Sequence, residues 1–281
     1  MILMTKKVVI LSTGGTISTL KDKEKGGLIN ELSGEDLISG IDFRLKVEVE
    51  NFAKITSVYI KPPMIYDLAE RVRQLQQEDD VEGIVVTNGT STMEEVSYFL
   101  DMIVSGEKPV VITGAQRSGS DPWPDGPGNI AAAVRVASYI QSRGKGVMVV
   151  FSNSIHQGKE IHKAHTWSLD PFDSRDKGRL GYVYPDKVVY YRNSQRSPLK
   201  LNEYIDYPVE IVMFYSGADA KMIEFLVSRK VRGIVIEAVG PGNVNDEFYN
   251  EIVKARAAGI EVVITTHCYG GRVMPCLLYT S

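Results

Sequence analysis

Lys7-Val-Val-Ile-Leu-Ser12-Thr-Gly-Gly-Thr16-Ile17 is the segment most informative about the fold, because it predicts a buried strand and the turn that ends it. Its first half is a continuous apolar, β-branched run, which is typical of a strand covered on both faces. The two adjacent glycines permit a sharp turn, since a residue without Cβ adopts backbone angles that are closed to other residues. We therefore predict a central parallel strand followed by a tight turn that carries hydroxyl side chains.

Similar apolar runs recur along the chain and alternate with helical patterns. The further predicted strands are residues 83–87, 109–113, 147–151, 211–214, 233–237 and 261–265. Between them, apolar residues repeat at helical spacing within 64–75, 96–103, 130–137, 222–226 and 248–255. Alternation of this kind predicts βαβ units and hence an α/β fold with a parallel sheet and helices on both of its faces.

A polar, turn-rich stretch that begins at Tyr191 predicts a domain boundary, because βαβ alternation restarts after it. We expect a large N-terminal domain over residues 1–190, a connector over 191–209 and a smaller α/β domain over 210–281. The small domain reads as incomplete. We interpret residues 276–281 as foreign to the fold and leave them out of the fold prediction.

Composition narrows the functional classes. The 281 residues include 32 basic and 35 acidic ones, for a net charge of −3, which disfavours nucleic acid or an anionic membrane as the main partner. No apolar run approaches the ~18 residues of a membrane span, and the start of the chain lacks the features of a signal peptide. The two cysteines, Cys268 and Cys276, form no disulfide framework or zinc motif. We expect a soluble, cytoplasmic, globular protein.

Candidate functional residues follow three of the predicted strands. The first strand ends in Ser12-Thr-Gly-Gly-Thr-Ile17, the second in Asn88-Gly-Thr-Ser-Thr-Met-Glu-Glu95 and the third in Gly114-Ala-Gln-Arg117. Because ligands bind beyond the carboxyl ends of strands in open parallel sheets, these turns are expected to share one site. The alternative is that Thr-Gly and Asn-Gly are simply good turn formers.

Other motifs point less clearly to chemistry. There is no phosphate-binding glycine motif, and the proline of Gly240-Pro-Gly-Asn243 removes an N–H donor from a possible cradle. The segment Asp121–Asn129 is either a rigid turn with Asn129 as a helix N-cap or a loop that shapes a pocket.

Histidines offer a weak metal hypothesis. His162 and His165 have Asp170 and Asp173 nearby, yet their spacing fits no known metal motif, so we expect the four histidines on the surface or in loops. Lys163, which lies between His162 and His165, is a candidate catalytic residue, because a lysine held in a pocket can act as a base toward a hydroxyl.

Together, the motifs resemble the bacterial-type L-asparaginase family over about residues 6–275. They are Thr13-Gly-Gly-Thr-Ile17, Gly89-Thr-Ser-Thr-Met-Glu-Glu95, Thr113-Gly-Ala-Gln-Arg117, Asp125-Gly-Pro-Gly-Asn129 and Lys163 with Thr166. The family includes glutaminase-asparaginases and the archaeal glutamyl-tRNA amidotransferase D proteins. The latter are less favoured, because they usually carry an extra N-terminal domain.

The resemblance implies catalytic roles for three residues. Thr16 matches the usual nucleophile, which attacks the side-chain amide carbon, and Thr90 matches a second hydroxyl that works with a lysine, here Lys163. The implied reaction is a two-step acyl transfer that releases ammonia from a small amide, asparagine or, as a second candidate, glutamine. The family requires no metal or organic cofactor.

The resemblance also implies substrate-binding roles. Ser57 matches the serine that holds the substrate α-carboxylate, and Ala115 matches a backbone carbonyl that lines the amide pocket. Asn243 matches a residue that reaches into the site of a neighbouring subunit. Family members are typically dimers or tetramers of paired subunits, so a homodimer or homotetramer is expected.

The chain departs from the family pattern within the site itself. Where the family usually reads H-G-T-D-T-M-E, this chain has Asn88 and Ser91 in place of the histidine and the aspartate. That aspartate is the countercharge for the substrate's α-ammonium, a role that an uncharged serine does not fill. A loop tyrosine found in many members is also absent from residues 24–31.

Three hypotheses follow from this departure. The first is an asparaginase that is slow or has a shifted substrate preference. The second is a related amidohydrolase whose substrate has a neutral or acylated amine. The third is a catalytically silent protein that binds an amino acid.

Overall fold

The computed structural model describes residues 6–22, 26–43, 45–196, 198–199, 204 and 206–274. The chain divides into two compact units, Met1–Tyr204 and Ile205–Ser281. This division falls inside the stretch that we interpret from the sequence as a connector. The stretch 276–281, interpreted above as foreign to the fold, lies outside the described residues.

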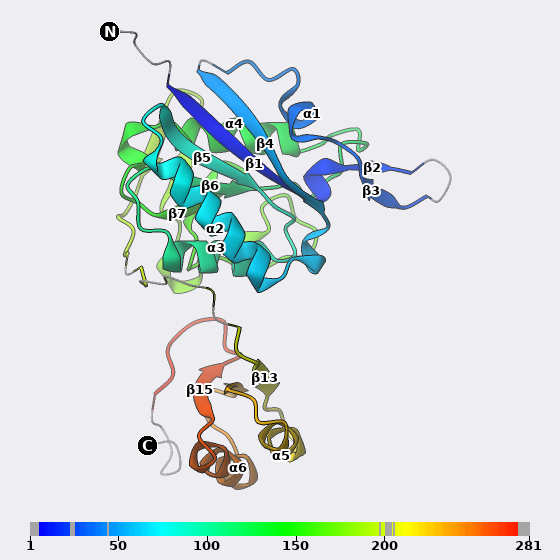
Figure 1. The fold of residues 1–281 in the computed structure, drawn as a ribbon, viewed down its shortest axis with the longest axis vertical. Helices are drawn as coiled ribbons and strands as arrows, with labels where there is room; N and C mark the ends of the chain where they lie inside the picture. Colours follow the sequence, from blue (N-terminus) through cyan, green and yellow to red (C-terminus); the bar gives the residue numbers. More distant parts are fainter. Residues whose placement is uncertain are drawn as a thin grey trace. The chain divides into compact units, whose positions relative to one another are not determined.

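The large unit is built on an eight-stranded sheet with the order β12-β11-β8-β7-β6-β5-β1-β4 (Figure 1). Its strands β4, β1, β5, β6 and β7 run parallel to one another, which confirms the α/β class predicted from the apolar runs. The bounds of these parallel strands are β1 Lys7–Gly14, β4 Lys46–Ile55, β5 Val81–Thr87, β6 Val110–Thr113 and β7 Val147–Phe151.

One edge of this sheet differs from the all-parallel prediction. Strands β8 (Ser154–Gln157), β11 (Gly181–Val183) and β12 (Val188–Tyr190) are antiparallel additions. A tight turn joins β7 to β8, and its residues Ser152 and Asn153 have φ values of 46° and 64°. Such short strands carry too few residues to show a hydrophobic period, so they could not be predicted from the sequence pattern.

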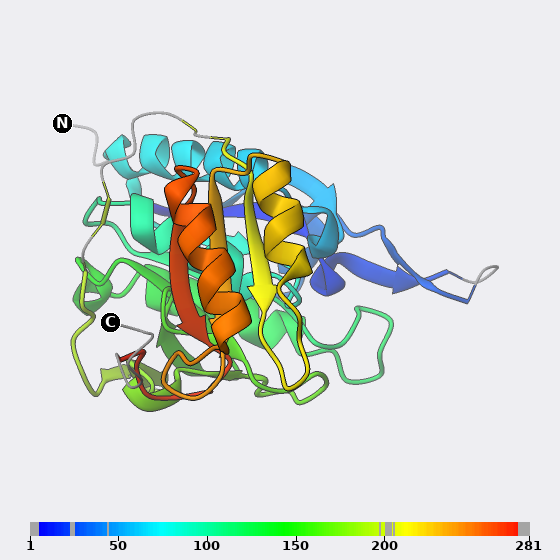
Figure 2. The ribbon, with the colours of Figure 1, turned by 90° about the horizontal axis from the view of Figure 1, so that it is seen from below.

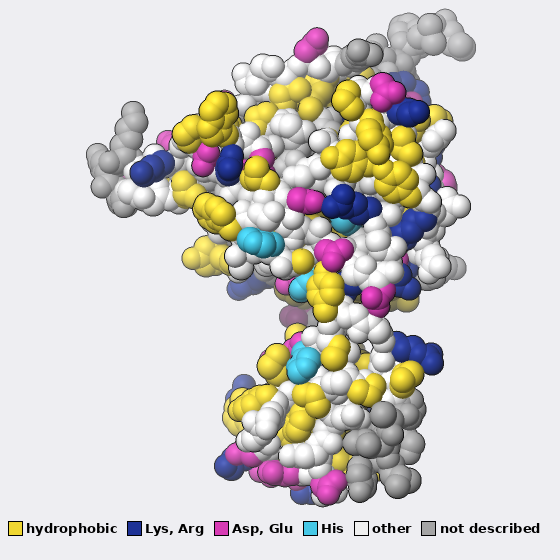
Figure 3. All heavy atoms as spheres, turned by 180° about the vertical axis from the view of Figure 1, so that it is seen from behind, with side chains coloured by type: hydrophobic (Ala, Val, Ile, Leu, Met, Phe, Trp, Pro, Cys, Tyr) yellow, Lys and Arg dark blue, Asp and Glu magenta, His cyan; other side chains and the backbone are white. Residues whose placement is uncertain are grey.

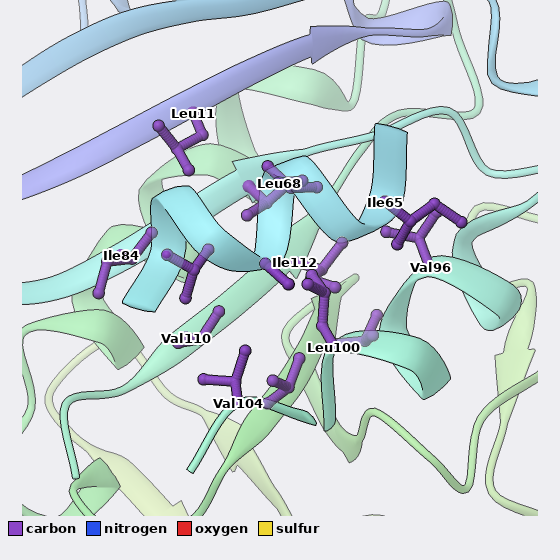
Figure 4. Packing of buried hydrophobic residues seen from close by; sticks show 14 of the residues in the cluster. Leu11, Ile65, Leu68, Ile84, Val96, Leu100, Val104, Val110 and Ile112 are labelled. Carbon is purple, nitrogen blue, oxygen red and sulfur yellow. The ribbon is translucent and has the colours of Figure 1, made fainter. Parts of the chain in front are cut away.

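Helices cover both faces of the large sheet, as predicted. On one face, α2 (Pro62–Gln77) and α3 (Met93–Ile103) pack on Leu11, Ile84 and Ile112 (Figure 4). On the other face, α1 (Gly34–Ile38) and α4 (Gly126–Ala137) cover alternate residues of the same strands. Each fully buried aliphatic side chain contributes about 1.5–3 kcal/mol, so these two cores hold the strand ends in place.

Short elements complete the large unit. A hairpin pairs β2 (Thr19–Lys21) with β3 (Leu28–Asn30), and a second small pair joins β9 (His162–Lys163) to β10 (Phe172–Asp173). Single 3-10 turns occupy Thr16–Ser18, Ser57–Tyr59, Ile140–Ser142 and Arg175–Lys177. The first two of these turns directly follow β1 and β4, and they carry site candidates.

The small unit is a three-stranded parallel sheet with the order β13-β14-β15. Helices α5 and α6 lie side by side against one face of this sheet (Figure 2). On the opposite face, Ile211 and Val263 are 72% and 58% exposed. The bounds are β13 Val209–Met213, β14 Gly233–Ala238, β15 Glu261–Thr266, α5 Lys221–Ser228 and α6 Asp246–Ala257.

Of the two alternatives for the segment Asp121–Asn129, the one with Asn129 as a helix N-cap is wrong. Helix α4 begins at Gly126, because proline is well suited to the first turn of a helix, and Asp125 takes the N-cap position. Asn129 is buried inside the helix instead, where its Nδ2 donates to the carbonyl of Gly114 at 3.0 Å and its Oδ1 accepts from the N–H of Ser152 at 3.0 Å. It therefore ties the end of β6 to the β7–β8 turn.

The expectation that all histidines lie on the surface or in loops is wrong for His156. This residue lies in β8 and is only 1% exposed. Its Nδ1 is 2.6 Å from the hydroxyl of Ser174, whereas its buried Nε2 has no hydrogen-bond partner among the described residues. Burial, aided by the nearby Arg179, lowers the pKa of His156 to about 4.

The buried His156 predicts that the protein loses stability below neutral pH. An unfolded histidine has a pKa of about 6.5, so between about pH 6.5 and 4 the unfolded chain binds a proton that the folded chain does not. The free energy of unfolding should therefore fall by about 3 kcal/mol over this range and level off below it. Urea unfolding from pH 7 to 4 measures this, and His156→Gln should remove that part of the slope. Parallel curves for the two proteins would contradict the prediction.

Acidic and basic side chains are interspersed on the face drawn in Figure 3. Within the described ranges, no helix has both the length and the apolar character that a bilayer span needs.

Candidate active site

A threonine and a lysine from different parts of the large unit meet beyond the end of β5. Thr90 follows the turn Asn88-Gly89, and Lys163 is the last residue of β9, where it pairs with Phe172 of β10. The Nζ of Lys163 donates a hydrogen bond to the Oγ1 of Thr90 at 2.7 Å. Thr90 is buried and Lys163 half-buried, so this contact is partly shielded from water. The two residues are 73 positions apart in sequence, and only the fold joins them.

The surroundings of Lys163 make its ammonium easier to deprotonate than that of an exposed lysine. Burial lowers the pKa of its ammonium, and the carboxylate of Glu94 partly opposes this effect. Glu94 also fixes the lysine's place in the site, because its Oε2 accepts from the backbone N–H of Lys163 at 2.6 Å. A lysine with a lowered pKa next to a hydroxyl has the arrangement of a general base and the group it activates.

The turn that carries Thr16 touches the turn that carries Thr90. Gly15 has a φ of +86°, and a Cβ at this position would lie 2.5 Å from both the Cα and the N of Gly89. Only a residue without Cβ allows this approach, which places Thr16 and Thr90 directly after two backbone segments in contact. Thr16 begins a 3-10 turn and is half-buried, and its hydroxyl has no hydrogen-bond partner among the described residues.

Ser57 belongs to the same convergence of turns. It begins the 3-10 turn that follows β4, it is 3% exposed, and a Cβ on Gly89 would lie 2.5 Å from its Oγ. Its carbonyl accepts from the hydroxyl of Thr92 at 3.2 Å. The ends of β1, β4 and β5 thus bring Thr16, Ser57 and Thr90 to one edge of the sheet.

The loop after β6 adds Gln116 to the residues around Thr90 and Lys163. Gln116 was not predicted as a site residue from the sequence. Its Oε1 accepts from the Oγ1 of Thr90 at 3.0 Å and lies 3.4 Å from the Nζ of Lys163. The carboxylate of Asp125 holds this loop by accepting from the N–H groups of Gln116 and Arg117 at 3.0 and 2.9 Å. Ala115 precedes Gln116 and is 1% exposed, in the core beside α4. The signal for Gln116 was its place in the motif at residues 113–117.

The two departures from the family motif have different environments. Asn88 is fully buried, and its side chain bridges the hydroxyl of Thr13 at 3.0 Å and the carbonyl of Gly89 at 3.0 Å. It therefore shapes the turn. Ser91 is exposed, and its hydroxyl has no partner within the described part of the chain, so it is available to a ligand.

Asn243 is the one predicted site residue in the small unit. It lies in the turn between β14 and α6, where its N–H donates to the carbonyl of Val239 at 2.8 Å. Its buried Oδ1 has no partner among the described residues. The contacts described above do not include it.

The histidine pair offers no metal site. His162 directs its Nδ1 to Glu94 Oε2 at 3.0 Å, whereas His165 accepts with its Nδ1 from the N–H groups of Trp167 and Ser168. Across the described ranges, no group of three or more His, Cys, Asp or Glu side chains is arranged to hold a metal ion.

Comparison with known proteins assigns both units. The family model described as "Asparaginase, N-terminal" matches residues 7–196, and the one described as "Glutaminase/Asparaginase C-terminal domain" matches residues 208–280. The chain belongs to the asparaginase family. This finding confirms the resemblance noted from the motifs.

Relatives in the asparaginase family span most of the chain. The L-asparaginase of Bacillus licheniformis is 34% identical over 96% of this chain and 84% of its own length. A glutamyl-tRNA(Gln) amidotransferase D protein of Methanococcus maripaludis is 30% identical over 95% of this chain and 68% of its own length. Among solved structures, a probable cytoplasmic L-asparaginase from Campylobacter jejuni has a TM-score of 0.89 at 29% identity, covering 96% of this chain and 86% of that one.

Proposed function

We propose that this asparaginase-family amidohydrolase is an L-asparaginase that converts L-asparagine to L-aspartate and ammonia. The observation that carries the proposal is the 2.7 Å contact between Lys163 and Thr90, at a turn in backbone contact with the one before Thr16. A free hydroxyl and a hydroxyl–amine pair at one sheet edge are the groups that amide hydrolysis by acyl transfer needs.

The first step forms an ester. The Oγ1 of Thr16 attacks the side-chain amide carbon, and the negative charge that develops on the amide oxygen is stabilised by backbone N–H donors of the glycine turns. The C–N bond then breaks, and the nitrogen leaves as ammonia with the proton of the Thr16 hydroxyl. Each such donor typically lowers the free energy of the transition state by about 3 kcal/mol, so the N–H groups of these turns would contribute directly to the rate.

The second step releases aspartate. A water molecule attacks the ester carbon while the neutral amine of Lys163, acting through Thr90, takes its proton. The bond between the acyl carbon and Thr16 breaks, and Thr16 regains a proton. In this proposal Ser57 binds the α-carboxylate and the carbonyl of Ala115 lines the amide pocket, the roles that the family resemblance implies for them. No metal or organic cofactor takes part in this scheme.

A second candidate function follows from Ser91. Its side chain is exposed and uncharged where asparaginases usually present a carboxylate to the substrate's α-ammonium. A substrate whose amine is acylated needs no such countercharge. The alternative is therefore an amidohydrolase for an amide without a free α-amine, and the amidotransferase relative supports a breadth of substrates in the family.

Ammonia release from a panel of amides tests both functions. We expect asparagine to be the best substrate, glutamine a slower one, and N-acetylasparagine to react within about tenfold of asparagine because Ser91 gives little preference for a charged amine. N-acetylasparagine reacting far faster than asparagine would favour the second function. If calorimetry shows that asparagine binds but no ammonia is released, the protein is a catalytically silent binding protein, and both proposed functions are contradicted.

Assembly and location also stay proposals. We propose a homodimer or homotetramer, because members of the asparaginase family are typically oligomeric and Asn243 matches the family residue that reaches a neighbouring subunit's site. We propose a cytoplasmic location, in line with the Campylobacter jejuni structure, which is that of a probable cytoplasmic asparaginase.

A further inference from the structure

The side chain of Gln116 has one defined orientation. Its Nε2 donates to the carbonyl of Ser168 at 3.0 Å, so a flipped amide would set its oxygen against that carbonyl. Its Oε1 is therefore the end that faces Thr90 and Lys163, at 3.0 and 3.4 Å. With its backbone N–H held by Asp125 as well, Gln116 is anchored at both ends.

The amine of Lys163 is held by neutral groups. Among the described residues, its Nζ has two hydrogen-bond acceptors, Thr90 Oγ1 and Gln116 Oε1, and no carboxylate within salt-bridge distance. An amide oxygen positions an amine through a directed hydrogen bond. A carboxylate in the same place would position it equally well but would also stabilise its charged form, which is inactive as a base.

We propose that Gln116 is a positioning residue for the lysine base: a neutral acceptor that anchors the Lys163 amine against Thr90 without supplying the negative charge that would keep this amine protonated. This proposal rests on the proposed function, since it assigns Gln116 a role within the Thr90–Lys163 unit. Gln116 acts through Lys163 and Thr90, and it takes no part in bond making itself.

The charged groups around Lys163 are compatible with this role. Glu94, from α3, uses its Oε2 on the backbone N–H of Lys163 and faces His162 at 3.0 Å. Asp173 of β10 lies opposite His162 in the strand register. Asp125, behind Gln116, accepts from two backbone N–H groups. Glu94 is the one carboxylate among these that raises the pKa of Lys163, and burial outweighs it.

Two substitutions at position 116 distinguish the effect of the hydrogen bond to Lys163 from the effect of a negative charge beside it. Gln116→Glu keeps the shape and the acceptor but adds a carboxylate, so we expect the midpoint of the Lys163 titration to rise by about one pH unit or more. At neutral pH kcat should then fall about tenfold per unit, and it should recover as the pH is raised. Gln116→Met removes the acceptor, so kcat should fall about tenfold or more at every pH while KM stays within about twofold.

The readouts are the pH dependence of kcat and KM for asparagine and the Lys163 titration followed by NMR with ¹³C-labelled lysine. Gln77→Glu, an exposed position on α2, adds the same charge away from the site and should change neither. Thermal unfolding shows that each variant is folded.

The outcomes distinguish the two proposals. A rise in KM at unchanged kcat in Gln116→Met would overturn the positioning role, because it would show that Gln116 binds substrate. An unchanged Lys163 midpoint in Gln116→Glu would overturn it as well. If the wild-type protein released no ammonia from any amide, the proposed function would fail, and the titration would still decide whether Gln116 controls the charge on Lys163.

Discussion

Replacing Thr16 by alanine is expected to reduce ammonia release from asparagine by about a thousandfold or more. Removing a nucleophile eliminates the covalent step, and what remains is the contribution of binding and of the oxyanion donors. The physical basis in this chain is the contrast between two hydroxyls. That of Thr16 is free among the described residues, whereas that of Thr90 accepts from Lys163 and donates to Gln116.

Thr16→Ser is the matched control, because it keeps the hydroxyl and should retain a substantial share of the rate. Steady-state kinetics gives the rates, and mass spectrometry of the protein quenched during turnover should find the acyl group on the peptide that contains Thr16. Substantial activity in Thr16→Ala, with the adduct on the peptide of Thr90, would reverse the assignment of the two threonines.

Introducing a carboxylate by Ser91→Asp is expected to raise kcat/KM for asparagine strongly. A charged partner in a shielded site contributes about 2–5 kcal/mol, which corresponds to about 30- to 4,000-fold. Because Ser91 is exposed to solvent, which weakens charge–charge interactions, the lower part of this range is the expected result. The gain should be confined to substrates with a free α-ammonium.

Ser91→Asn serves as the control, since it changes the size of the side chain without adding charge and should give no comparable gain. The measurement is kcat/KM for asparagine and N-acetylasparagine in all three proteins. Equal changes for both substrates, or no change for asparagine, would show that residue 91 does not face the α-amine.

Much of the fold could be predicted from periodicity. The buried strands β1, β5, β6 and β7 were recognised because strands covered on both faces are apolar throughout. Strand β4, with alternating charged residues, was missed because it lies at the edge of the sheet. The buried His156 was also missed, since nothing in its neighbours along the chain indicates that β11 and Ser174 enclose it.

The residues of the candidate site were predicted from their chemical type and from the motifs in which they occur. Thr16 and Thr90 follow strands whose carboxyl ends are expected to share an edge, so their proximity was open to prediction. The role of Gln116 was not, because it depends on the direction of one amide, which the carbonyl of Ser168 sets.

The α/β class, the family and the available chemical groups follow from residue types and from their spacing along the chain. Which of these groups meet depends on tertiary packing. Lys163 lies 73 positions from Thr90 and 47 from Gln116, and it reaches them only because the β9–β10 pair lies beyond the end of β5. Local sequence patterns do not predict such contacts. The distance between segments far apart in the chain is set by how their buried faces pack.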